Sequence, residues 1–257
     1  YRQAESSHIV LNAHKINAGE LITLNNKNKD FFFFEKQDVR SVMGALIYLV
    51  KTKLPEYIGT SPFEIQVLTP MRKGELGVEH LNEVLQYYLN PASESKKEKE
   101  GRTGVFREGD KVMQVKNNYK LEWKITNAKG FSVEEGLGVF NGDMGVIKQI
   151  NTYSERITVV FDENREVEYP YSNLDELELA YAITIHKSQG SEYPAVVLPL
   201  LSGPPILCNR NLLYTAITRA QKCAAIVGRQ SMVEQMIHNE TEQKRYSGLN
   251  ECLKDGI

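Results

Sequence analysis

The sequence predicts an α/β domain that is built on a parallel sheet and interrupted by a small antiparallel β-barrel. Three observations lead to this fold class. Helical and strand patterns alternate over residues 1–90, short strands with turn signals fill 104–173, and the alternation returns after 173. The 257 residues leave room for roughly 1.7 domains of ordinary size. Hydrophobic residues at 41% and charged residues at 25% exclude a disordered or fibrous chain.

The first part of the chain alternates helix and strand. A helix that begins after Ser6 or Ser7 buries Ile9, Ala13 and Ile16 and ends at residue 19. The elements expected next are a strand over 31–34, a helix over 39–50, a strand over 64–68 and a helix over 76–89. This order predicts a parallel sheet covered on both faces.

The middle of the chain has a different texture. Residues 92–102 contain no large apolar side chain and predict a solvated loop or linker. Short strands are expected over 110–115, 139–140, 145–150, 156–161 and 166–169, with Asn141-Gly142 as a tight turn. Five short strands within roughly 70 residues are typical of a small barrel.

The α/β pattern then returns. We expect strands over 179–184, 195–200 and 223–227, and helices over 209–219 and 232–237. The simplest organisation is one α/β domain over 1–103 and 174–257, with the barrel inserted over 104–173.

Charge and cysteine content exclude several classes of protein. The 31 basic and 33 acidic residues give a net charge of −2, which excludes a cationic coat but not a local basic groove. The longest apolar runs, 42–50 and 195–201, are too short to span a bilayer. Three cysteines fit no zinc or redox motif, so we expect no metal site and a reducing, cytoplasmic location.

The segment 180–192 holds the first candidate site. An apolar strand runs directly into Thr184, His186, Lys187, Ser188 and Gly190. Ligands of open parallel sheets bind at the carboxyl ends of strands, where small hydroxyls and free backbone N–H groups suit a phosphate oxygen. The alternative is that these residues only form the entry turn of a helix.

The segment 211–222 holds the second candidate. Leu212, Leu213, Ala216 and Ile217 form the apolar face of a helix, and Arg219 follows at its end. An arginine on a packed helix is pre-positioned for a bidentate contact with phosphate. The alternative is a partner for the carbonyls at the helix C-terminus.

Several segments together resemble the helicase motifs of superfamily 1. TIHKSQGSE at 184–192 resembles motif V, LLYTAITRA at 212–220 resembles motif VI, and YRQA at 1–4 resembles motif IV. LTPMRKG at 68–74 resembles an accessory motif of the RecD-like branch. GDKVMQ at 109–114 and FNGDMGV at 140–146 resemble its SH3-like insert. The chain is therefore similar to the C-terminal half of a RecD-like helicase, the family of the exodeoxyribonuclease V alpha subunit.

The resemblance implies a RecA-like second motor domain, of the P-loop NTPase-like class, with an inserted SH3-like β-barrel. In this family ATP binds between two motor domains. Arg2 and Arg219 would reach the γ-phosphate as catalytic residues, and Tyr1 would lie against the adenine. Gln3, Gly190 and Glu192 would complete the nucleotide-binding set.

The resemblance also implies a DNA-binding set. Thr184, His186 and Ser188 would face the phosphates of single-stranded DNA, joined by Thr69 and Arg72. The implied activity is 5′→3′ movement on single-stranded DNA by an ATP-dependent helicase of DNA repair or recombination. The implied partners are the upstream motor domain of the same polypeptide and other exodeoxyribonuclease V subunits, without a membrane.

No phosphate loop of the form Gly-x-x-x-x-Gly-Lys occurs in the sequence. Because the family places this loop and the magnesium carboxylate before motif IV, we expect ATP and Mg²⁺ to bind mainly to an upstream domain. The chain alone is then expected to be inactive as an ATPase.

Two other functions fit the same residues. One is a stand-alone single-stranded nucleic-acid-binding or interaction module built on the barrel. There, Trp123 and Tyr119 either stack on bases or cap the barrel core. Lys111, Lys116, Lys120 and Lys124 either follow a phosphate backbone or form a solvated face. The other is the C-terminal helicase part of a conjugative relaxase.

Overall fold

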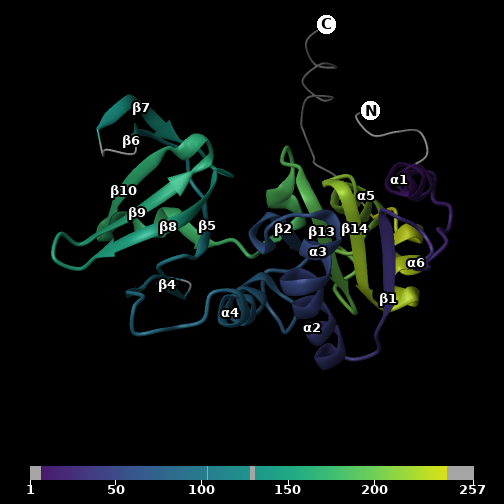
Figure 1. Ribbon diagram of the computed structural model, residues 1–257. Coiled ribbons are helices and arrows are strands. Elements are labelled where there is room, and N and C mark those ends of the chain that lie inside the picture. The colour runs from purple at the N-terminus through teal and green to yellow at the C-terminus, as the bar shows by residue number, and fades with distance from the viewer. Residues whose placement is uncertain (1–6, 103, 128–130, 242–257) are drawn as a thin grey trace, which may run out of the picture.

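A parallel sheet and an antiparallel sheet lie side by side in the computed structural model, which describes residues 7–102, 104–127 and 131–241 (Figure 1). The parallel sheet has five strands in the order β1 (Phe31–Glu35), β14 (Ala220–Gly228), β13 (Tyr193–Leu200), β2 (Ile65–Thr69) and β12 (Ala182–Thr184). Every neighbouring pair in it is parallel. The α/β class and the second, antiparallel sheet confirm the predicted fold.

Helices cover both faces of the parallel sheet. On one face are α2 (Val39–Tyr48), α3 (Leu54–Ile58) and α4 (Val78–Leu89). On the other are α1 (His8–Ala18), α5 (Arg210–Ile217) and α6 (Gln230–His238). Successive side chains of a strand point to opposite faces, so β13 sends Ala195 and Val197 to the first layer and Val196 and Leu198 to the second. Both faces of the parallel sheet are therefore buried under helices, as is usual for a sheet whose strands are joined by helical crossovers.

The helix expected over 39–50 continues further than predicted. Asp38 caps α2 by accepting a hydrogen bond from the backbone N–H of Ser41 at 2.9 Å. The chain then passes through a π-helical turn (Leu49–Lys53) into α3, without the stop that the sequence suggested near residue 50. Short 3₁₀ turns occur at Pro62–Glu64, Asp162–Asn164, Tyr171–Glu176 and Ile185–Ser188.

The antiparallel sheet, here called the barrel sheet, has seven strands, and its neighbouring strands run antiparallel. Their order is β11 (Leu177–Leu179), β5 (Lys111–Gln114), β8 (Met144–Asn151), β9 (Arg156–Phe161), β10 (Glu166–Pro170), β6 (Asn118–Thr126) and β7 (Ser132–Val139). The hairpin of β6 and β7 is more extensive than the short strand expected near residue 139. A two-stranded ribbon of β3 (Glu98–Glu100) and β4 (Val105–Arg107) also forms where a loop was predicted at its start.

The single strand expected over 179–184 is wrong. Leu179 pairs with Val112 of the barrel sheet, whereas Ala182 pairs with Val67 of the parallel sheet. The chain therefore changes sheets across residues 180 and 181. The sequence gives no sign of this change of sheet, because the side chains on both sides of it are buried and form one continuous apolar run. The barrel sheet thus includes residues beyond 173, and the boundary at that residue stays a prediction.

A buried polar network joins the two sheets, and we call it the junction network. The Asp110 carboxylate accepts hydrogen bonds from Gln86 Nε2 (2.6 Å), Asn90 Nδ2 (2.7 Å), Tyr181 Oη (2.9 Å) and the Arg107 backbone N–H (2.6 Å). All four donors are neutral. Burial raises the pKa of Asp110 more than these hydrogen bonds lower it.

The prediction that Lys111, the next residue, lies on the surface is wrong. Lys111 was expected on a surface, whether along a phosphate backbone or on a solvated face, but it is only 7% exposed. Its ammonium group donates to the Phe63 carbonyl at 2.6 Å and to Gln66 Oε1 at 2.9 Å. Desolvation lowers the pKa of Lys111 to about 8. Its role is therefore structural.

Candidate functional site

The described residues of the predicted nucleotide-binding and DNA-binding sets fall into two groups at opposite edges of the parallel sheet. Thr69 and Thr184 are the last residues of β2 and β12, and they are register partners. Arg219 directly precedes β14, and Glu192 directly precedes β13, so both lie at the amino edge. Through β2, Thr69 is level with Pro199, six residues beyond Tyr193. At about 3.3 Å per residue, the two groups are separated by roughly 20 Å.

The Arg219 guanidinium is held entirely by neutral oxygens. It donates to the Ser191 carbonyl (3.0 Å), the Thr215 carbonyl (3.3 Å) and Thr218 Oγ1 (3.3 Å). Among the residues that the structure describes, no carboxylate pairs with it. The bond to the Thr215 carbonyl, in the last turn of α5, agrees with the alternative that Arg219 partners a helix C-terminus. Because the guanidinium is only half-buried and has no counter-charge there, it can also receive an anion.

The loop before β13 presents backbone beside this arginine. Gly190 is exposed and has φ +90, with nothing within 4 Å of the position a Cβ would take. Its positive φ favours glycine there, since other residues rarely adopt it. Glu192 is exposed and accepts from Gln221 Nε2 at 3.3 Å.

Tyr1, Arg2 and Gln3 lie outside the described residues. The nearest described anchor is Ser7, whose hydroxyl donates to Asp30 Oδ2 at 2.6 Å. Asp30 directly precedes β1, and its carbonyl accepts from the backbone N–H of Ala224 in β14. The start of α1 is therefore anchored at the amino end of β1, which is level with Cys223 of β14, four residues beyond Arg219.

At the carboxyl edge, only part of the predicted DNA-binding set is exposed. His186 is exposed, and Thr184 is partly exposed and caps the 3₁₀ turn Ile185–Ser188 through its hydroxyl. Ser188 and Thr69 are fully buried. Their hydroxyls donate to the Ile185 carbonyl and the Leu76 carbonyl, each at 2.7 Å. A direct phosphate contact would require these two side chains to leave their present hydrogen bonds.

Arg72 is exposed but already paired. Its Nη2 donates to Glu178 Oε1 at 2.7 Å, and its Nε lies 3.3 Å from Glu79 Oε1. Lys187 Nζ donates to the other oxygen of Glu178 at 2.8 Å. Sequence reasoning missed Glu178, which lies 106 residues from Arg72 along the chain. No local pattern marks a carboxylate whose partners are so distant.

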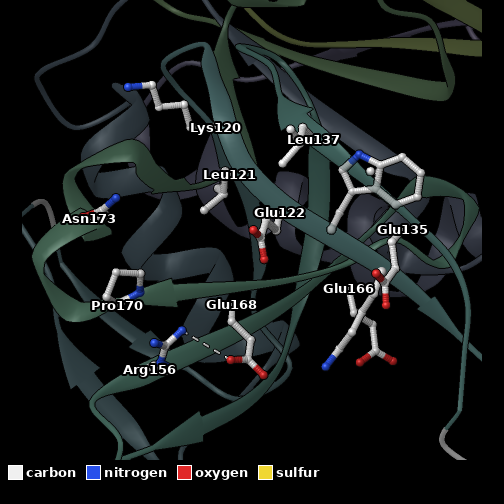
Figure 2. A pocket seen from close by; sticks show the side chains of 13 residues that line it. Lys120, Leu121, Glu122, Glu135, Leu137, Arg156, Glu166, Glu168, Pro170 and Asn173 are labelled. Carbon is white, nitrogen blue, oxygen red and sulfur yellow. Dashed lines mark hydrogen bonds and ion pairs between the residues drawn. The ribbon is translucent and has the colours of Figure 1, made fainter.

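A hollow of about 650 Å³ opens on the barrel sheet, away from both groups (Figure 2). It is lined by carboxylates such as Glu122 and Glu166 as well as by cations, and Arg156 pairs with Glu168 at 3.4 Å within it. This mixture of charges does not favour a phosphate backbone. Trp123 packs on the barrel core with its ring against Gly136, which favours the core-capping alternative for this side chain.

In the described part of the chain, neither the cysteines nor the acidic residues indicate a metal centre. Cys208 and Cys223 are free and buried, and burial raises the pKa of Cys223 to about 12. Within residues 7–102, 104–127 and 131–241, no group of three or more His, Cys, Asp or Glu side chains is arranged to hold a metal ion. Across the same ranges no helix has the length and apolarity to cross a membrane.

Comparison with known families agrees with the motifs. Residues 81–161 match the family model of the ATP-dependent RecD-like DNA helicase SH3 domain. Residues 179–227 match the family model of the UvrD-like helicase C-terminal domain. The second match contains Thr184, Gly190 and Arg219. The resemblance predicted from the sequence is thereby confirmed for both parts of the chain.

Curated relatives point the same way. The chain is 34% identical over 221 residues to the ATP-dependent RecD2 DNA helicase of Deinococcus radiodurans, a match that covers 86% of this chain and 27% of that protein. It is 30% identical over 191 residues to the RecBCD enzyme subunit RecD of Mycolicibacterium smegmatis, covering 74% of this chain and 29% of that subunit. The chain thus spans less than a third of the length of these relatives.

Solved structures support the fold. The Pif1 helicase from Bacteroides, crystallised in complex with ADP-AlF3 and single-stranded DNA, superposes with a TM-score of 0.50. The match covers all of this chain and 55% of that one, at 17% identity. At that identity the comparison bears on the fold alone, and it agrees with a RecA-like parallel sheet.

Proposed function

We propose that this RecD-like helicase chain forms the second of two RecA-like motor domains, with its SH3-like barrel, in an ATP-dependent DNA helicase. The observation that carries the proposal is Arg219, a guanidinium at the amino edge that is oriented by three neutral oxygens. Phosphoryl transfer needs charge stabilisation more than covalent chemistry, and an arginine finger is worth about 10³ to 10⁵ in rate.

In this proposal the amino edge faces the nucleotide. Arg219 and Arg2 contact the γ-phosphate, and Tyr1 lies against the adenine. Gln3, Gly190 and Glu192 complete the nucleotide-binding set. The sequence contains no phosphate loop, so ATP and Mg²⁺ are held mainly by another motor domain. The proposal requires the segment that leads into Ser7, which is anchored at the amino end of β1, to bring Arg2 to the same crevice as Arg219.

The carboxyl edge faces single-stranded DNA, which His186, Thr184 and Arg72 contact. Burial of Thr69 and Ser188 favours a positioning role for these two, because their hydroxyls shape the loops that present the others. We further propose 5′→3′ movement in DNA repair or recombination, in the cytoplasm, as the motif resemblance implies. The relative named RecBCD enzyme subunit RecD supports other exodeoxyribonuclease V subunits as candidate partners.

The segment 184–192 explains how the two edges would be coupled. It begins at the last residue of β12 and ends just before β13, so nine residues connect the DNA edge to the nucleotide edge. Its Ser191 carbonyl also accepts from Arg219. Closure of a cleft on ATP would therefore move the grip on DNA along with the arginine.

The test replaces Arg219 in a protein that carries both motor domains. Arg219→Ala should lower DNA-stimulated ATP turnover at least about 1000-fold, because the transition-state charge loses its partner, and should leave DNA affinity within about twofold. The matched control is Arg229→Ala. Arg229 follows the opposite end of β14, is exposed and donates to the Gln37 carbonyl, so its loss should change neither quantity.

The isolated chain should show only background ATP hydrolysis with single-stranded DNA present. Clear turnover by this chain would overturn the assignment of its amino edge as one half of a composite site. Loss of DNA binding with intact hydrolysis in Arg219→Ala would favour a stand-alone nucleic-acid-binding module instead.

A further inference from the structure

Two stretches of the chain that are far apart in sequence, one at residue 72 and one at 178–187, meet at one carboxylate on the carboxyl edge. Glu178 lies on β11 of the barrel sheet, Arg72 follows β2, and Lys187 lies in the 3₁₀ turn after β12. The two cations bind different oxygens of Glu178, at 2.7 and 2.8 Å. We call these three residues the edge triad.

The triad resembles a phosphate contact in its geometry. A carboxylate offers two oxygens to a guanidinium and an ammonium, as a phosphate group does. Burial alone would raise the pKa of Glu178, but the hydrogen bonds from Lys187 and Arg72 outweigh it, so the pKa lies below the usual value. Glu178 is therefore ionised at neutral pH.

The triad is also accessible. The side chain of Arg72 is 46% exposed and that of Lys187 28%, against 19% for Glu178. A cavity of about 20 Å³ lies beside the ion pair of Arg72 and Glu178, and Glu79 also lines it. The guanidinium is thus not encased, and a ligand at this edge can reach the cations from solvent.

We propose that Glu178 is an internal competitor of the DNA phosphates: it occupies Arg72 and Lys187 until a phosphate of single-stranded DNA displaces it. This inference rests on the proposed function, since it assumes that the carboxyl edge takes single-stranded DNA. Its physical basis is charge. With Glu178 and Glu79 in place the local cluster of two cations is neutral, so binding a phosphate requires exchange rather than simple addition.

The experiment measures binding of the chain to a fluorescein-labelled oligo-dT by fluorescence anisotropy at low salt. Glu178→Gln removes the competing charge and keeps the shape of the side chain. We expect affinity to rise about threefold to tenfold, in line with the range of exposed to partly buried ion pairs. Glu178→Asp keeps the net charge but is too short to hold both cations, so it should raise affinity by a smaller factor.

The matched control is Glu83→Gln, on α4. Glu83 lines the same small cavity, but among the described residues its ion pair is with His80. The change in net charge is therefore the same, without a contact to Arg72 or Lys187. Its affinity should stay within about twofold of the unmodified chain. In a background of Arg72→Ala with Lys187→Ala, Glu178→Gln should have no effect.

Three outcomes overturn the inference. One is oligo-dT binding that is equal in the unmodified chain and in Glu178→Gln. Another is an equal gain in oligo-dT affinity in Glu83→Gln, which would show that the effect comes from the change in net charge alone. The third is no binding by any of these proteins, which would defeat the proposed DNA edge as well. The first two leave the proposed function standing.

Discussion

Two polar links join the barrel to the parallel sheet, and they differ in burial and in the charge of the interacting groups. The junction network is buried, and its ionisable groups meet only neutral partners: Asp110 accepts from neutral donors, and Lys111 donates to neutral oxygens. The edge triad is partly exposed, and Glu178 is bound by two full charges. The first therefore suits a permanent joint, whereas the second suits an exchangeable contact.

The difference between the two links follows from the free-energy cost of breaking a contact in each of them. A buried donor that loses its acceptor has no water to replace it, which costs about 1–3 kcal/mol for each group. An exposed charge that loses its partner is solvated at once, and exposed ion pairs are worth about 0–1 kcal/mol. Mutations in the two links should therefore differ in size and in their dependence on pH and salt.

The largest expected effect is at Asp110. Asp110→Ala leaves Gln86, Asn90 and Tyr181 without their buried acceptor and should lower the free energy of unfolding by about 3–5 kcal/mol. Urea denaturation followed by circular dichroism measures it. Asp175→Ala is the control, because Asp175 makes an exposed pair with Lys116. A loss below about 1 kcal/mol at Asp110 would show that the junction is not a stabilising joint.

The next effect is a pH dependence from Lys111. Its pKa is about 8 in the folded chain against 10.5 ordinarily, so the unfolded chain binds more protons between these values. The free energy of unfolding should then rise with pH, by up to about 2 kcal/mol from pH 8 to pH 9.5. The nearby charges of Glu64 and Asp162 favour the protonated form but are outweighed by burial.

Lys111→Met should remove this rise, and Lys116→Met, at an exposed lysine, should retain it. Urea unfolding at four pH values between 7.5 and 9.5 measures the slopes. Equal slopes in the two variants would contradict the assignment of Lys111 as the titrating group.

The smallest expected effect on stability is at the edge triad. Glu178→Gln should change the free energy of unfolding by about 1 kcal/mol or less, and added salt should shrink even that difference. The same urea experiment, at low and at high salt, measures it. A loss as large as that of Asp110→Ala would erase the distinction between the two links and make Glu178 a second permanent joint.

Much of the fold was predictable because its elements follow local periodicity. The helix that buries Ile9, Ala13 and Ile16, the strand that ends at Thr69 and the helix before Arg219 follow patterns that a short window contains. The β6–β7 hairpin also left a signal, since Leu121, Trp123 and Ile125 alternate with charged residues. The lysines of the same stretch, Lys120 and Lys124, instead favour a surface patch and so conceal the hairpin in the sequence.

The candidate site was less predictable for a different reason. Motif similarity selected Arg219, Thr184 and Arg72, but it could not show that Arg72 is already neutralised. Lys111 looks like any lysine in a basic stretch, because the oxygens that bury it come from residues 45 and 48 positions away. Long-range partners of this kind leave no mark in a local window.

The passage from β11 to β12 has a mechanical consequence. Only residues 180 and 181 separate Leu179 in one sheet from Ala182 in the other, and the Ala180 N–H is bonded to the Lys111 carbonyl. A connection of two residues, one of them hydrogen-bonded through its backbone, has little conformational freedom. Any force that rotates the barrel would thus be transmitted to Thr184 within a few residues, with no flexible linker to absorb it.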